Sequence, residues 1–206
     1  MYRFVQFSVK NRGGWKLMDE SQVSSLENSP AFMTVLALDQ DPEALVEAGE
    51  DPINHVKYFG PMYWDFDGVE IGPVLEDVKK LIEWLNKKLG VPKEFIHCWL
   101  SGKKGVHITV PPEVFGIKTP TKQLPLIWKE LALQTKLETL DLGVYSAGRG
   151  RIWRCEGVKR PTGTYKVGVS VEEMLQMDEE QYAVLVASPR PPLHLETPDK
   201  KVVFAP

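Results

Sequence analysis

The stretch MYWDFD at residues 62–67 decides the fold class that this sequence predicts. Its residues alternate with a period of two, which is the side-chain period of a β-strand. The alternation puts one set of side chains, Tyr63, Asp65 and Asp67, on one face, and the other set, Met62, Trp64 and Phe66, on the opposite face. We therefore expect a strand with one carboxylate face and one buried apolar face.

The segments that follow this strand predict a helix and a hairpin. Apolar residues recur at helical spacing from Val74 to Leu89, and Gly90 ends the pattern. Residues 96–100 and 106–110 are expected to be strands joined by a turn at 101–105, with His107 and Thr109 on one face. A helix that packs on a sheet with a polar hairpin tip is the consequence.

The rest of the chain predicts further strands and helices, and no internal repeat is found. The expected strands are 2–9, 32–38, 140–145, 151–155 and 164–169, and the expected helices are 41–48 and 122–137. This mixture predicts an α/β or, more specifically, α+β fold. At 206 residues, one domain over 1–206, built as two closely packed lobes, is expected.

Composition excludes several classes of protein. The apolar fraction of 43% and charged fraction of 26% are those of an ordinary globular chain. The sequence shows no membrane-spanning stretch and no secretory signal, which predicts an intracellular protein. Two cysteines, Cys98 and Cys155, are too few for a Cys-rich zinc site and are expected to be buried or partly buried thiols.

Charge is distributed unevenly along a chain whose net charge is −3. Six cations lie between residues 149 and 166 against Glu156 alone: Arg149, Arg151, Arg154, Lys159, Arg160 and Lys166. Guanidinium groups suit phosphate oxygens, so this segment predicts a phosphate-binding surface. A solvated basic loop is the alternative, and for Lys159 and Arg160 it is the interpretation that the sequence favours.

Asp65 and Asp67 lie two residues apart on a strand and therefore project to the same side. The repulsion between two such carboxylates favours a hard cation such as Mg²⁺ or Mn²⁺ between them. Asp141 lies in an otherwise apolar segment, where an unpaired acid is costly, and is the candidate third carboxylate. The alternatives are that the first two acids face solvent and that Asp141 pairs with a following arginine.

The turn SGKKGVH at residues 101–107 combines groups that bind phosphate. It contains two glycines, a hydroxyl in Ser101, the cations Lys103 and Lys104, and the imidazole of His107. Glycines let the backbone approach an anion, and the cations supply charge. An ordinary hairpin turn without a ligand, and a strand histidine with a local hydrogen bond, are the alternatives.

The order and spacing of these three motifs resemble the archaeo-eukaryotic primase superfamily. The segment from Asp141 to Tyr145 followed by Arg151-Ile-Trp-Arg154 is especially similar to its primase-polymerase branch. The resemblance covers roughly residues 58–169. It implies a sheet of the RNA-recognition-motif kind, acting as the palm, packed against a second α/β module with the active site between them.

The resemblance also implies chemistry, cofactors and partners. Asp65, Asp67 and Asp141 would hold two divalent ions, Mg²⁺ or Mn²⁺, and the expected activity is template-dependent joining of nucleoside triphosphates on single-stranded or primed DNA. The groups expected to bind the nucleotide are Ser101, Lys103, Lys104, His107, Arg149, Arg151, Arg154 and Lys166. Further domains, or replication, repair or defence proteins, are possible partners.

Two other functions are consistent with parts of the sequence. A metal-dependent glycosyltransferase also uses Asp-x-Asp, and a non-catalytic nucleic-acid-binding module also uses a sheet with aromatic side chains. The first leaves the second and third motifs unexplained, and the second leaves three acids facing a phosphate backbone. One departure from the resembled family is the lack of a zinc-binding element, so extension of a primer is expected to be more efficient than initiation.

Overall fold

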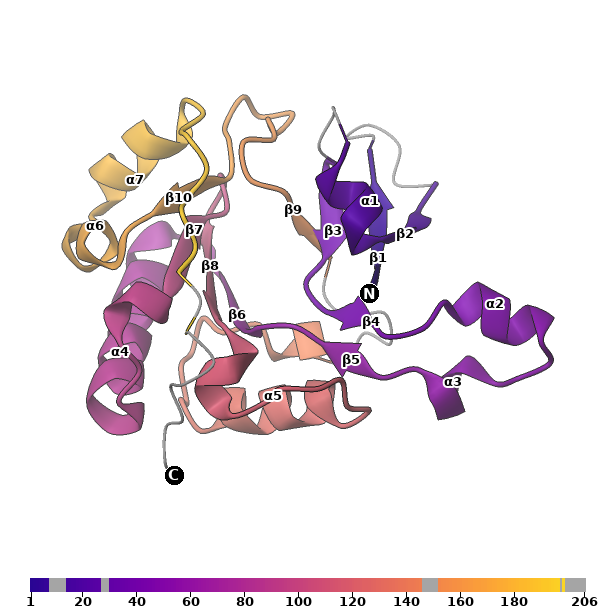
Figure 1. Cartoon of the computed structure of the whole chain (residues 1–206). Coiled ribbons are helices and arrows are strands. Elements are labelled where there is room, and N and C mark those ends of the chain that lie inside the picture. The colour runs from indigo at the N-terminus through magenta and orange to yellow at the C-terminus, as the bar shows by residue number, and fades with distance from the viewer. Residues whose placement is uncertain (8–13, 27–29, 146–151, 197, 199–206) are drawn as a thin grey trace.

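The computed structural model describes residues 1–7, 14–26, 30–145, 152–196 and 198. Its frame consists of two antiparallel sheets, with helices packed on the outer side of one of them (Figure 1). We call the four-stranded sheet the central sheet and the other the second sheet. The fold is therefore α+β, which confirms the class expected from the sequence.

The central sheet contains the strand that the sequence analysis began with. Its order is β10 (Val167–Val169), β7 (His97–Leu100), β8 (Gly105–Val110) and β6 (Met62–Asp67). Strands β7 and β8 form the expected hairpin, and β6 is an edge strand of this order. In this order β6 has a single neighbouring strand, β8, so the backbone groups of its outer edge can pair with another segment.

Helix α4 (Ile71–Leu89) covers the apolar face of the central sheet (Figure 1). Its apolar residues recur at helical spacing and are buried, among them Val74, Val78 and Leu81. The helix ends at Gly90, which has φ 67° and donates its backbone N–H to Leu85. Together with α6 (Val171–Gln176), this helix closes the main core.

The second sheet is built largely from the amino-terminal part of the chain. Its order is β5 (Tyr58–Phe59), β4 (Ala37–Leu38), β1 (Tyr2–Gln6), β3 (Phe32–Thr34) and β9 (Ile152–Arg154), and β2 (Lys16–Asp19) also pairs with β1. The strand β9 comes from much later in the chain and lies on the side nearest the central sheet (Figure 1). It therefore connects the two sheets.

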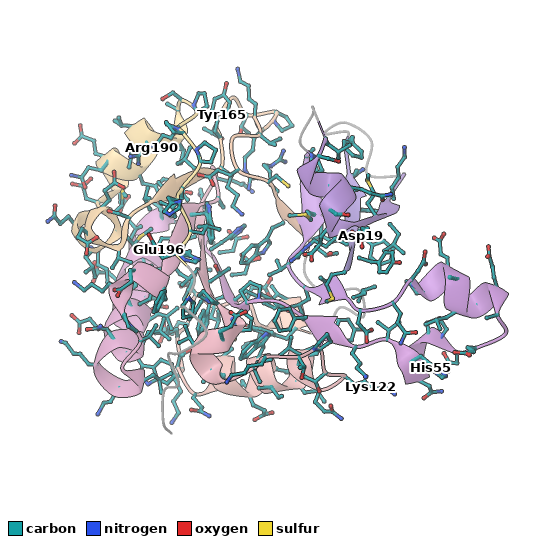
Figure 2. The ribbon with its side chains drawn as sticks, in the orientation of Figure 1. Asp19, His55, Lys122, Tyr165, Arg190 and Glu196 are labelled. Atoms are coloured by element: carbon teal, nitrogen blue, oxygen red, sulfur yellow. The ribbon has the colours of Figure 1, made fainter. Side chains whose placement is uncertain are left out.

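Short helices flank the strands of the second sheet. Helix α1 (Glu20–Ser24) follows β2, and α2 (Pro42–Glu47) and α3 (Pro52–His55) form a projecting arm (Figure 1). A small core of Leu38, Leu45 and Val56 lies at the base of this arm. The ammonium of Lys122 donates to the carbonyl oxygen of Asn54, and Figure 2 shows Lys122 and His55 at the same end of the molecule.

The remaining elements close the molecule around the central sheet. They are α5 (Leu124–Leu133), α7 (Glu179–Val186) and three 3₁₀ turns, η1 (Lys93–Phe95), η2 (Pro112–Phe115) and η3 (Leu142–Tyr145). Cys98 is buried and Cys155 half-buried, and both are free thiols, as expected. No helix in the described part of the chain is long and apolar enough to cross a membrane.

Three expectations about the elements need correction. The strand expected at 32–38 is two strands, β3 and β4, and the helix expected at 122–137 is the shorter α5. The strand expected at 140–145 is wrong, because only Leu140 pairs, in a bridge with Phe66, and the chain then forms η3. Asp141 explains the change, since its Oδ1 accepts the backbone N–H of Gly143 at 2.9 Å and turns the chain.

Candidate functional site

The face of the central sheet that looks toward β9 carries the polar side chains. Residues that pair across strands share a face, and the register places Asp65 beside His107, and His107 beside Trp99. Asp67 pairs with Gly105 and Tyr63 with Thr109 on the same face. The expected alternation of β6 is confirmed, and it gathers an acid, an imidazole and an indole in one row.

Asp141 joins this row through the outer edge of β6. Leu140 forms an antiparallel bridge with Phe66, the Asp141 N–H donates to the Asp65 carbonyl at 2.9 Å, and the Asp67 N–H donates to Thr139 at 3.0 Å. An antiparallel bridge places the flanking residues opposite each other, so Asp141 lies opposite Asp65. Two acids that are far apart in the sequence therefore become cross-strand neighbours.

A buried carboxylate on α4 holds the segment that carries Asp141. Asp77 Oδ2 accepts the backbone N–H and the hydroxyl of Thr139, both at 3.0 Å. Burial by itself would raise the pKa of Asp77, but the hydrogen bonds from Thr139 and Lys80 outweigh it and lower that pKa. The sequence analysis did not identify Asp77, which lies within an amphipathic helix like any other polar residue.

Asp65 is buried, with 5% of its surface exposed, and its two oxygens have different neighbours. The indole N–H of Trp153 donates to Asp65 Oδ2 at 3.1 Å, and His107 Nε2 lies 3.5 Å from Asp65 Oδ1. The Trp153 ring also stacks on the His107 ring, with centroids 4.1 Å apart and an interplanar angle of 20°. Asp65 is thus the most constrained of the three acids.

Asp67 and Asp141 are more open to solvent than Asp65. Asp67 is exposed and its Oδ1 accepts the N–H of Gly68 at 3.0 Å, while Asp141 is half-buried and bonds Gly143. Across the described residues, no three His, Cys, Asp or Glu side chains already form a group that could hold a metal ion. A carboxylate has about four lone-pair sites, so these bonds do not exhaust its capacity, and the hard oxygen donors on this face suit a divalent cation.

The turn at residues 101–105 is held against other parts of the chain at close range. A Cβ atom on Gly102 would lie 2.4 Å from the Tyr165 carbonyl oxygen, and one on Gly105 would lie 2.4 Å from that of Phe66, so both positions require glycine. Gly102 also has φ 83°. Ser101 is buried, and Tyr182 donates its hydroxyl to Gly105 O at 3.0 Å.

The two lysines of this turn are exposed. Lys104 donates its ammonium to the Val69 carbonyl, and both lysines line a hollow of about 650 Å³ at the hairpin tip. Glu70, Thr164 and Tyr182 also line it, whereas Asp65, Asp67 and Asp141, all of them described, do not. Of the residues expected to bind phosphate in this motif, His107 lies beside Asp65, and the two lysines line the hollow at the hairpin tip.

Lys166 lies in the interior between two indoles. It is 5% exposed, and its Nζ is 5.2 Å from the ring centroid of Trp99 and 4.8 Å from that of Trp153. Burial lowers the pKa of Lys166 to about 8, although Cys155, Glu156 and Asp65 act in the opposite direction. The amine is therefore close to the acids but shielded from solvent.

Arg154 and Arg160 are half-buried arginines that contact other parts of the chain. Arg154 lies over the Phe32 ring at 4.6 Å, and its Nε is buried with no hydrogen-bond partner among the described residues. Arg160 donates Nε to the Ser101 carbonyl at 2.7 Å. Burial lowers the pKa of both guanidiniums, and Arg160 lowers that of Arg154 further. Within the described chain, no ion pair joins either one to a carboxylate.

The solvated-loop interpretation was wrong for Arg160, which is half-buried, while Lys159 is exposed with its ammonium 5.7 Å from the Tyr165 ring. Arg149 and Arg151 lie outside the described residues. Sequence reasoning also missed Trp153 and Tyr182, because an aromatic residue at a strand or helix position predicts core packing and nothing more. Neither a family model nor a curated protein matches this sequence.

Proposed function

We propose that this chain is a template-dependent DNA primase-polymerase that joins nucleoside triphosphates by two-metal nucleotidyl transfer. The observation that supports it most is the register of the β6 edge, which sets Asp141 opposite Asp65 on the face that carries Asp67 and His107. Acids from two separate segments converge there, and the nearby cations Arg160 and Lys166 form no ion pair with a carboxylate among the described residues. Such a pairing suits a ligand that brings both divalent cations and phosphates.

In this proposal Asp65, Asp67 and Asp141 hold the two divalent ions. The ions, when bound, supply activation of a 3′-hydroxyl and neutralisation of the pyrophosphate that leaves. The orientation of the Asp65 carboxylate is held by Trp153 and His107. Asp67 and Asp141 are more exposed to solvent. Hence the three acids have different roles in assembling one site.

In the same proposal, the triphosphate is bound by a hydroxyl, an imidazole and cations next to the three acids. Ser101, His107, Arg154 and Lys166 supply a hydroxyl, an imidazole and two cations, and Arg149 and Arg151 are proposed to add to them. We include Arg160, because it bonds the Ser101 carbonyl and lies near Arg154. Two half-buried guanidiniums that repel each other favour an anion between them.

The deciding experiment is incorporation of labelled deoxy- and ribonucleotides on primed and unprimed templates with Mg²⁺ or Mn²⁺. Product that follows the template sequence is expected for the wild type and for Glu83→Gln, an exposed control on α4 far from the acids. Asp67→Asn and Asp141→Asn are expected to lose it. DNA binding without incorporation would support a non-catalytic binding module, and transfer from nucleotide sugars would support a glycosyltransferase.

A further inference from the structure

Trp153 makes several directional contacts with the polar face of the central sheet. It donates its indole N–H to Asp65, stacks on His107, and meets the Tyr63 ring edge-on with centroids 5.9 Å apart. Lys166 lies over the same indole. Four members of the polar face therefore contact one side chain.

The backbone of Trp153 belongs to the other sheet. In β9 it pairs with Met33 of β3, so its main chain is held by the second sheet while its side chain reaches the central one. The side chain is 8% exposed. The indole therefore links the second sheet to Asp65 and His107, so the position of β9 determines where these two side chains are held.

Two other tryptophans show what a purely packing role looks like in this protein. Trp64 and Trp128 are completely buried, and their indole nitrogens have no hydrogen-bond partner within the described residues. Among the aromatic rings of the described residues, Trp128 contacts that of Phe115 alone. A core role does not need the indole N–H, whereas Trp153 uses it on a carboxylate.

We propose that Trp153 is a positioning residue that sets the orientation of the Asp65 carboxylate and of the His107 ring. This inference rests on the proposed function for its effect on turnover. The indole N–H donates to Oδ2 and His107 Nε2 lies 3.5 Å from Oδ1, so turning the carboxylate plane away from this orientation weakens both contacts. Groups outside the ligand shell typically change metal affinity or activity by about 10- to 100-fold, because they aim the ligand.

The first test compares Trp153→Phe with Trp128→Phe, which makes the same change of size in the core. Trp153→Phe keeps an aromatic ring beside His107 but loses the indole N–H and part of the ring area, and Trp128→Phe controls for that loss of ring area. We expect kcat to fall by about 10- to 100-fold with the nucleotide KM within about twofold, and no such change in Trp128→Phe. The thermal unfolding midpoints of Trp153→Phe and Trp128→Phe, with that of Trp153→Tyr as a second variant of the same position, separate a loss of kcat from a folding defect.

The second test measures Mn²⁺ binding by electron paramagnetic resonance of the free ion, without nucleotide or DNA. Trp153→Phe is expected to weaken Mn²⁺ binding by about 10-fold, and Trp128→Phe to leave it unchanged. In an Asp65→Asn background, Trp153→Phe is expected to add nothing, because it acts through Asp65.

The outcomes separate this inference from the proposed function. If the wild type polymerises and Trp153→Phe behaves like Trp128→Phe in both tests, the positioning role is wrong and the function stands. If the wild type does not polymerise but Trp153→Phe still weakens Mn²⁺ binding, the positioning role stands and the function is wrong. A change in KM alone would make Trp153 a nucleotide contact, and a wild type that neither polymerises nor binds Mn²⁺ would overturn both.

Discussion

The two faces of the central sheet are held by different kinds of interaction. On the α4 side Met62, Trp64 and Phe66 are completely buried and pack without directional contacts. On the β9 side the alternate residues are held by hydrogen bonds, ring stacking and charge. Substitutions on the first face should therefore change stability, and substitutions on the second should change binding and turnover.

The largest effect is expected for Asp67 and Asp141, the two acids of the polar face that are more open to solvent than Asp65. Asp67→Ala and Asp141→Ala should lower kcat by about 10³-fold or more, equivalent to about 4 kcal/mol, because each removes a metal ligand. The free energy of unfolding should stay the same or rise in Asp67→Ala, since a repelling carboxylate is removed, whereas in Asp141→Ala the lost bond from Gly143 offsets this gain. Incorporation assays and denaturant unfolding on the same preparations check both parts, and substantial activity in Asp141→Ala would refute the three-acid site.

The opposite pattern is expected on the apolar face. Leu81→Ala removes a fully buried side chain of α4 and should lower the free energy of unfolding by about 2 to 5 kcal/mol. Activity per folded molecule should be unchanged. Val69→Ala is the matched control, because Val69 is 83% exposed. A large loss of kcat in folded Leu81→Ala would mean that the two faces are not independent.

Substitution of Arg154 tests whether the half-buried arginines contact the nucleotide. Arg154→Ala should raise the nucleotide KM and lower kcat/KM by a factor equivalent to about 2 to 3 kcal/mol. Arg154→Lys should restore only part of the lost kcat/KM, because an ammonium lacks the bidentate fork of a guanidinium. DNA affinity should change much less. Weaker DNA binding with an unchanged nucleotide KM would assign this cluster to the template instead.

The smallest effect concerns Lys166, whose pKa burial lowers to about 8. The folded state disfavours the protonated amine, so Lys166 destabilises the fold fully below about pH 8, and this penalty fades as the pH rises toward 10.5. We therefore compare the free energy of unfolding of Lys166→Met with that of the wild type at two pH values. The advantage of Lys166→Met should be about 2 kcal/mol larger at pH 7 than at pH 10. Denaturant unfolding at both pH values measures this, and an equal difference at the two would show that the amine is not desolvated.

Local patterns predicted most of the elements that carry the candidate site. The period-two alternation of residues 62–67 predicted both faces of β6, and the glycines of the turn at 101–105 predicted the β7–β8 hairpin. The segment after Leu140 was misread, because its apolar residues fit a strand as well as a turn. There the bond from Gly143 to Asp141 outweighs strand propensity.

The sequence by itself determined which side chains share a face of a strand or a helix, because side-chain direction follows from backbone period alone. Only the tertiary structure decided that Asp141 lies opposite Asp65, that Arg160 reaches Ser101, and that Trp153 covers His107. Each of these contacts joins segments that are distant in the chain, so it depends on how whole sheets and edges pack together. No periodicity within one segment encodes that packing.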